Sequence, residues 1–204
     1  MTSIASIVHI VDDDAAIRDA LEFLLQTHGI GSRSWPDAEH FLVDYRESMR
    51  GCILLDVRMT GMTGPECFDI LQQRGCRMPV VFLTGHGDVP LAVEALRAGA
   101  IHFIEKPPQH ALLLSAVREA LQRDALLQAE MDQRSDVAER IDQLSPRERE
   151  VMKLVLEGKL NKIIADELDI SMRTVEVHRS NVFDKMGVRS AVELATLVGR
   201  AEKA

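Results

Sequence analysis

Five polar side chains among the first 106 residues each stand close behind a short apolar run: Asp12, Asp13, Asp56, Thr84 and Lys106. Carboxylates that are brought together repel and raise one another's pKa values, so three of them at one place require a cation. Mg²⁺ (or Mn²⁺) suits such oxygen ligands, because it binds carboxylates, retains waters and accepts phosphate oxygens. Beside such an ion a carboxylate can attack a phosphoryl group, and a lysine and a threonine can steady the oxygens of the product.

The apolar runs have the length and composition of buried strands. Apart from His9 and His102, the runs Ile7–Val11, Cys52–Leu55, Val80–Leu83 and Ile101–Ile104 are continuously apolar rather than alternating. This pattern is typical of strands covered on both faces, as in a parallel sheet. With a weaker strand candidate at Ile30–Trp35 and helical periodicity between the runs, the chain predicts a doubly wound, five-stranded parallel α/β domain.

Helical stripes separate the predicted strands. In the fourth of these helices, over Val89–Ala98, Asp88 is the expected N-cap and Leu96 belongs to the apolar stripe. The other helices are expected around residues 17–25, 41–45 and 68–71, and from Gln109 onward.

In an open parallel sheet, ligands bind outside the carboxyl ends of the strands, at a topological switch point. Placing the first and third strands side by side brings Asp12, Asp13 and Asp56 together. The sequence therefore predicts one phosphoryl-acceptor site with Asp56 as the nucleophile. We expect Asp13 to bind the metal directly and Asp12 to bind it directly or through water, with the backbone carbonyl of Arg58 as a further ligand.

The second half of the chain has a different organisation. Residues 123–143 are polar and charged and lack Gly and Pro, which predicts an exposed helical linker that could continue the fifth helix. It would separate a domain of residues 1–122 from one of residues 144–204. In the latter, Ser145 is the expected N-cap of the first of four helices, before a proline at the first helical position.

Two of these helices, Asn161–Leu168 and Ser171–Met186, have the spacing of a helix-turn-helix, whose second helix would enter the major groove. Glu176 can accept from a cytosine amino group, Val177 can meet a thymine methyl, and Arg179 can reach a guanine edge or a phosphate. The pattern alone leaves open that these helices bind protein and that their basic residues are a solvated surface. The predicted DNA contacts are Lys162, Thr174, Glu176, Val177, Arg179, Ser180 and Lys185.

Charge and cysteine content narrow the function classes. The net charge of −8 argues against a nucleic-acid partner for the chain as a whole, but residues 144–204 hold 11 Lys+Arg against 10 Asp+Glu, whereas residues 1–122 hold 10 against 16. Three unclustered cysteines exclude a disulfide scaffold and a four-thiolate zinc site and favour the reducing cytoplasm. No run approaches the roughly 20 apolar residues of a membrane span, so no membrane partner is expected. A redox sensor built on Cys52, Cys67 and Cys76 is the weakest alternative.

Four segments of the first 120 residues resemble the receiver domain of bacterial two-component response regulators: VDDD at 11–14, LDVRM at 55–59, LTGHGDVP at 83–90 and FIEKP at 103–107. The resemblance implies phosphotransfer to Asp56 from a sensor histidine kinase. It also implies a switch pair, in which Thr84 moves toward the phosphate and the ring of Phe103 turns inward behind it. Two residues depart from the family: Thr60 stands where proline is usual, and Pro108 replaces a frequent Phe or Tyr. We expect both to alter loop geometry.

The C-terminal segment resembles the LuxR-type helix-turn-helix in LSPREREV at 144–151, NKIIADELDIS at 161–171 and RTVEVHRSNVFDKM at 173–186. The whole chain is similar to the FixJ-type regulators. This resemblance implies a cytoplasmic transcription regulator whose receiver restrains the DNA-binding unit until phosphorylation favours a homodimer. Its expected partners are the kinase, double-stranded promoter DNA and RNA polymerase. The implied dimer face, comprising the fourth helix, fifth strand and fifth helix, would place two recognition helices about 34 Å apart.

Two rival functions use the same features. An aspartyl-phosphate enzyme would normally have a second acid two residues after the nucleophile, where this chain has Arg58. A receiver that switches protein-binding helices is the other rival. We expect a phospho-acceptor and not an enzyme.

Overall fold

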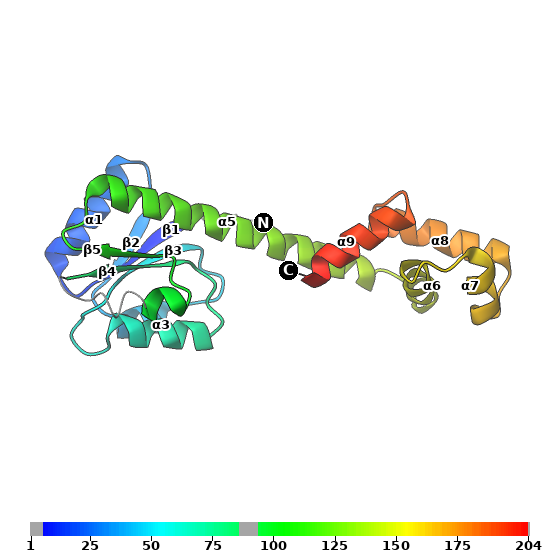
Figure 1. Ribbon diagram of the computed structural model, residues 1–204, viewed down its shortest axis with the longest axis horizontal. Helices are drawn as coiled ribbons and strands as arrows, with labels where there is room; N and C mark the ends of the chain where they lie inside the picture. Colours follow the sequence, from blue (N-terminus) through cyan, green and yellow to red (C-terminus); the bar gives the residue numbers. More distant parts are fainter. Residues whose placement is uncertain (1–5, 86–93, 204) are drawn as a thin grey trace. The chain divides into compact units, whose positions relative to one another are not determined.

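The computed structural model describes residues 6–85 and 94–203, and its contacts divide the chain into two compact units, Met1–Leu127 and Gln128–Ala204. The first unit is a parallel sheet between helices, and the second is entirely helical where it is described (Figure 1). Within the described ranges, none of the helices has the length and apolar character that crossing a membrane requires.

The predicted parallel sheet is confirmed. Its strands run in the order β2-β1-β3-β4-β5, and all neighbouring pairs are parallel. The second strand is shorter than its predicted range and begins at Ser32. The strands are β1 Ile7–Val11, β2 Ser32–Trp35, β3 Gly51–Asp56, β4 Val80–Thr84 and β5 His102–Glu105.

Helices cover both faces of the sheet, which explains why the central strands β3 and β4 are apolar almost throughout. Alternate residues of a strand point to opposite faces. Leu54 of β3 accordingly packs with residues of α1 and α5, whereas Ile53 and Leu55 pack with residues of α2 and α3. Figure 1 shows α1 and α5 on one side of the sheet and α3 on the other. These helices are α1 Ala15–Thr27, α2 Ala38–Asp44, α3 Gly64–Gln73 and α5 His110–Asp142.

The predicted fourth helix lies only partly within the described residues. Residues 94–97 are helical, whereas the proposed N-cap Asp88 falls outside the described part of the chain. The placement of Leu96 in the apolar stripe is wrong, because its side chain is 46% exposed and Ala95 is the residue that faces the core. Successive helical residues point about 100° apart, so Leu96 turns away from the core when its neighbour Ala95 faces it.

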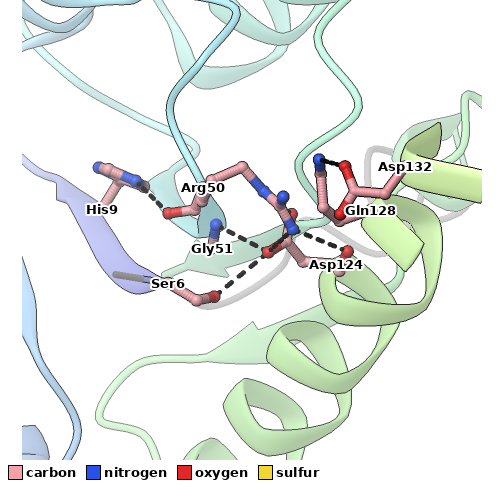
Figure 2. A network of polar contacts seen from close by, with 7 residues as sticks. All are labelled: Ser6, His9, Arg50, Gly51, Asp124, Gln128 and Asp132. Carbon is pink, nitrogen blue, oxygen red and sulfur yellow. Dashed lines mark hydrogen bonds and ion pairs between the residues drawn. The ribbon is translucent and has the colours of Figure 1, made fainter. Parts of the chain in front are cut away.

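The fifth helix continues through the predicted linker to Asp142. The expectation that this linker is exposed is wrong at Asp124 and Val137, which are both buried. The carboxylate oxygen Oδ2 of Asp124 accepts from Arg50 Nη2 at 2.9 Å, from the Gly51 amide at 3.1 Å and from Ser6 Oγ at 3.2 Å (Figure 2). These bonds attach α5 to the amino ends of β1 and β3, at the opposite end of the strands from Asp56.

Four helices follow α5 in the second unit. Ser145 and Ser171 cap the first and third of them, as expected from their sequence. Their apolar faces enclose a core that includes Val151, Ile164 and Val182, with Val137 of α5 packed against it. The helices are α6 Pro146–Leu156, α7 Asn161–Leu168, α8 Met172–Met186 and α9 Ala191–Lys203.

Candidate functional site

The ends of β1 and β3 bring three carboxylates together. Val11 pairs with Leu55 in the parallel register, so Asp12 and Asp56, the next residues along the two strands, lie side by side. One carboxylate oxygen from each of Asp12, Asp13 and Asp56 lies within 4.8 Å of the others. Asp12 and Asp56 are buried and Asp13 is exposed, so the cluster opens to solvent on one side.

Lys106 supplies the positive charge of the cluster. It follows β5, and its ammonium lies 2.6 Å from Asp12 Oδ2 and 2.9 Å from Asp56 Oδ1. Burial works against the ammonium, but its hydrogen bonds to the two carboxylates outweigh burial and raise the pKa of Lys106. The peptide bond between Lys106 and Pro107 is cis, and Pro108 is half-buried.

The carboxyl groups of Asp56 and Asp13 have opposite pKa shifts. Burial raises the pKa of Asp56 more than the hydrogen bond from Lys106 lowers it. The pKa of Asp13 is lowered, chiefly by hydrogen bonds from the backbone N–H and the hydroxyl of Thr60. Asp13 is therefore the more readily ionised of the two.

The residues present fit a divalent cation. Three ionised carboxylates and one ammonium leave a net charge of −2 in a site where two of the carboxylates are buried. Oxygen donors in this arrangement are the ligands that Mg²⁺ prefers, and Asp12, Asp13 and Asp56 would hold it. The carbonyl of Arg58 remains a predicted ligand, while the N–H of the same residue donates to Asp56.

Three residues that the sequence analysis did not identify shape this site. Arg18 Nη1 donates to the Asp12 carbonyl at 2.7 Å, and the Asp14 amide donates to Asp12 Oδ1 at 3.0 Å. Gly64 opens α3 so close to β3 that a Cβ there would lie 2.2 Å from the Asp56 carbonyl oxygen. A glycine at the first position of a helix is a weak signal, and nothing local marks Arg18 as a partner of Asp12.

The two residues of the predicted switch lie on neighbouring strands. Thr84 ends β4, is almost fully buried, and its Oγ1 donates to the Gly85 carbonyl at 3.1 Å. Phe103 of β5 is half-buried, and its ring centroid lies 6.4 Å from that of Phe82. Phe103 thus packs against the core on the α2 and α3 face of the sheet. The movement of this pair is a prediction.

On α7 and α8, the predicted DNA contacts Lys162, Glu176, Val177 and Ser180 are solvent-exposed. The side chain of Val177 is 51% exposed, and those of Met172 and Leu160 are 51% and 71% exposed. Thr174 is half-buried, and its hydroxyl shares a 2.8 Å hydrogen bond with that of Ser171.

The other two predicted contacts have partners within the helical unit. Arg179 donates to Asn161 Oδ1 at 2.6 Å, and its guanidinium lies 5.4 Å from the Phe183 ring centroid. Lys185 lies 2.7 Å from the buried carboxylate of Glu148. An arginine has five N–H donors and a lysine three, and Lys185 is solvent-exposed, so these contacts leave both residues able to contact DNA as well.

Glu148 ties the start of α6 to the end of α8. Its carboxylate accepts from the Ser145 amide at 2.8 Å and from Lys185. The hydrogen bonds from Lys185 and from Ser145 lower the pKa of Glu148 from its ordinary 4.5 to about 2. Its contribution to stability is therefore complete above about pH 4.5 and is lost as the pH falls through about 2.

We accordingly expect Glu148→Gln to destabilise the helical unit by about 1.5–3 kcal/mol at neutral pH, the usual value of hydrogen bonds to a charged group. The matched variant Glu150→Gln, which removes an exposed pair with Arg147, should cost less than about 1 kcal/mol. Amide hydrogen exchange of α6 in the full chain measures the loss of stability in each variant. The effect of Glu148→Gln should shrink on acidification, and a pH-independent difference would contradict the assignment.

The cysteines do not support a redox function. Cys52 and Cys67 are fully buried free thiols, and burial raises the pKa of each to about 12. The half-buried Cys76 has its pKa raised by burial as well. Thiols react as thiolates, so a raised pKa makes all three poor redox sensors.

Two family models match the chain. The response regulator receiver domain matches residues 8–118, and the luxR family of bacterial regulatory proteins matches residues 142–198. These ranges contain the acidic cluster and the helix-turn-helix respectively. A receiver domain joined to a luxR-family domain is typical of transcription regulators and not of catalytic enzymes. The alternative function of an aspartyl-phosphate enzyme is therefore wrong.

Curated proteins resemble the chain over most of its length. The C4-dicarboxylate transport transcriptional regulatory protein DctR of Rhodobacter capsulatus is 48% identical over 93% of this chain and 98% of its own. The transcriptional regulatory protein FixJ of Azorhizobium caulinodans is 47% identical over 93% of this chain and 90% of its own.

Solved structures agree with these matches. The structure of the response regulator StyR is similar with a TM-score of 0.87 and 38% identity, and covers 96% of this chain and 98% of that one. The structure of full-length FixJ from B. japonicum has a TM-score of 0.58 and 40% identity, and covers 99% of this chain and 100% of that one.

Proposed function

The chain belongs to the FixJ-type response regulators, which join a receiver domain to a LuxR-type helix-turn-helix, and we propose that Asp56 is the residue through which phosphorylation regulates it. It is a phosphorylation-regulated transcriptional regulator. The observation that carries the assignment of Asp56 is its place in the acidic cluster, at the end of β3 and 2.9 Å from the Lys106 ammonium. Residues 1–122 would form the receiver, 123–143 the helical linker and 144–204 the DNA-binding domain.

In the proposed reaction, a carboxylate oxygen of Asp56 attacks the phosphorus of a phosphohistidine on the sensor kinase. An O–P bond forms as the N–P bond breaks, and the imidazole leaves with the bonding pair. Mg²⁺ held by Asp12, Asp13 and Asp56, with the Arg58 carbonyl as a further ligand, supplies charge neutralisation at the phosphoryl oxygens when bound. Lys106, already hydrogen-bonded to Asp56, steadies an oxygen of the product.

Phosphorylation of Asp56, at the end of β3, then changes the charge beside Thr84, at the end of the neighbouring strand β4. The new group carries about −1.5 to −2 charges and three acceptor oxygens, to which the Thr84 hydroxyl can donate. Thr84 would exchange its bond to Gly85 for one to the phosphate, and Phe103 would turn inward behind it. Such a two-state change relieves the inhibition of the DNA-binding domain and favours a homodimer.

The output of the dimer is binding to a two-fold DNA operator. We place Glu176, Val177 and Ser180 against base edges, and Lys162 and Thr174 against phosphates near helix N-termini, where backbone N–H groups favour anions. Arg179 and Lys185 would join them through N–H donors that their bonds to Asn161 and Glu148 do not use. We also propose that RNA polymerase is a further partner and that the protein acts in the cytoplasm.

Selection of bound sequences from random DNA duplexes, at one stated salt concentration, tests this function. We expect enrichment of a two-fold motif when acetyl phosphate and Mg²⁺ are present, with a mass increase of one phosphoryl group on the intact chain. Phosphorylation without enrichment of any sequence would favour the alternative in which the C-terminal helices bind protein.

Two classes of variant separate base readout from phosphate contact. Val177→Ala should lower affinity for the selected duplex by up to about 1.5 kcal/mol, the value of two buried carbon groups, and relax its sequence preference, because a base contact carries sequence information. Lys162→Ala should weaken binding to all duplexes alike and reduce the salt slope by about 1. Binding titrations over a range of salt distinguish these results, with Lys153→Ala on α6, an exposed lysine outside the predicted contacts, as the matched control.

A further inference from the structure

Thr60 makes two hydrogen bonds to one metal-ligand candidate. Its backbone N–H donates to Asp13 Oδ2 at 2.8 Å, and its hydroxyl donates to the same oxygen at 2.9 Å. Proline, the usual residue at this position of the family, has neither a backbone N–H nor a hydroxyl. The departure therefore adds a bidentate donor beside the acidic cluster.

The loop that carries Thr60 is anchored directly after this residue. Glu39 of α2 lies close to Gly61, and its Oε1 accepts from the Met62 amide at 3.0 Å. Further along, Thr63 and Glu66 form a capping box at the start of α3. The donors of Thr60 are thus fixed in place before any ligand arrives.

Asp13 needs such support more than its neighbours do. Asp12 is fully buried and receives hydrogen bonds from Lys106 and the Asp14 amide, whereas Asp13 is exposed. An exposed carboxylate must lose side-chain freedom when it binds a metal. Two donors on Oδ2 remove part of that freedom in advance and leave Oδ1 for the ion.

We propose that Thr60 is a positioning residue of the metal site, which orients the Asp13 carboxylate for a divalent cation. The proposal rests on the proposed function, because it takes Asp13 as a metal ligand. Groups that hydrogen-bond to a metal ligand orient it, and their loss typically weakens metal affinity by roughly 10–100-fold.

Isothermal titration of the full-length chain with Mg²⁺ tests the proposal without any phosphodonor. Thr60→Val keeps the backbone N–H and the side-chain shape but loses the hydroxyl, so its Kd for Mg²⁺ should rise several-fold. Thr60→Pro loses both donors, and its Kd should rise by roughly 10–100-fold. Thr60→Ser restores the hydroxyl and should bind within about two-fold of the natural chain.

The control is Thr27→Val, whose hydroxyl donates to the Leu24 carbonyl at the exposed end of α1 and which should leave the Kd unchanged. Natural affinity in both Thr60→Val and Thr60→Pro would overturn the proposal and leave the proposed function standing. If Thr60→Pro does not fold, as judged by circular dichroism, Thr60→Val compared with Thr60→Ser decides the question. Absence of Mg²⁺ binding by the natural chain would instead overturn the metal site itself.

Discussion

Asp56→Asn will take up no phosphoryl group from acetyl phosphate and Mg²⁺, and it will not dimerise in response to them. The amide of asparagine is not a nucleophile toward phosphorus, so the O–P bond cannot form. Intact-mass spectrometry measures the modification, and sedimentation velocity measures the dimer. We expect complete loss of both responses.

The same substitution should leave the fold intact. Burial raises the pKa of Asp56, so ionisation of this carboxylate opposes folding, and its cost grows as the pH rises through that pKa. At neutral pH the neutral asparagine should be at least as stable as the natural residue, with Lys106 still able to donate to its oxygen. Loss of function in Asp56→Asn will therefore reflect chemistry and not unfolding.

Asp14→Asn is the matched control for this experiment. Asp14 caps α1 by accepting from the Ala16 amide, and asparagine is an equally good cap. It stands next to the cluster in sequence but is not among the three carboxylates that share the site. A phosphorylated Asp56→Asn chain, or an Asp14→Asn chain that cannot be phosphorylated, would contradict the assignment of Asp56.

Asp124→Ala will destabilise the first unit by about 3–5 kcal/mol, the usual cost of removing one partner of a buried ion pair. The substitution leaves Arg50, whose side chain is 17% exposed, without its carboxylate. It also removes the acceptor of the Gly51 amide and of Ser6 Oγ (Figure 2). Gly51 packs directly against β1, since a Cβ there would lie 1.7 Å from the Ile7 carbonyl oxygen.

Urea unfolding of the full chain followed by the fluorescence of Trp35 measures this effect. Trp35 is the single tryptophan of the chain and ends β2, so its signal reports on the first unit. Glu119→Ala removes an exposed ion pair with His102 from the same helix and should cost less than about 1 kcal/mol. Equal effects of the two substitutions would contradict a special role for the buried pair.

A double variant separates the pair from the packing of α5. Arg50→Met with Asp124→Leu replaces both charges by apolar side chains of similar size, and such replacement is often neutral or stabilising. We expect it to recover most of the stability lost in Asp124→Ala. Failure to recover would indicate that the Gly51 and Ser6 hydrogen bonds carry most of the effect.

The sequence by itself determined the elements and the chemistry at their ends. The strand Ile7–Val11 has its predicted bounds, and Ser145 and Ser171 cap the helices that follow them. These features depend on patterns within a few residues, namely apolar runs, capping side chains and helix breakers. Asp12, Asp13 and Asp56 could be placed together as well, because the carboxyl ends of parallel strands meet at one edge of a sheet.

Only the tertiary structure decided which partners these residues have. Thr60 reaches Asp13 across 47 residues of sequence, Lys185 reaches Glu148 across 37, and Arg50 reaches Asp124 across 74. A polar residue in a linker is expected to be exposed, and Asp124 is buried because α5 returns to the start of β3. Such contacts depend on how whole elements pack, and no local pattern in the sequence records that packing.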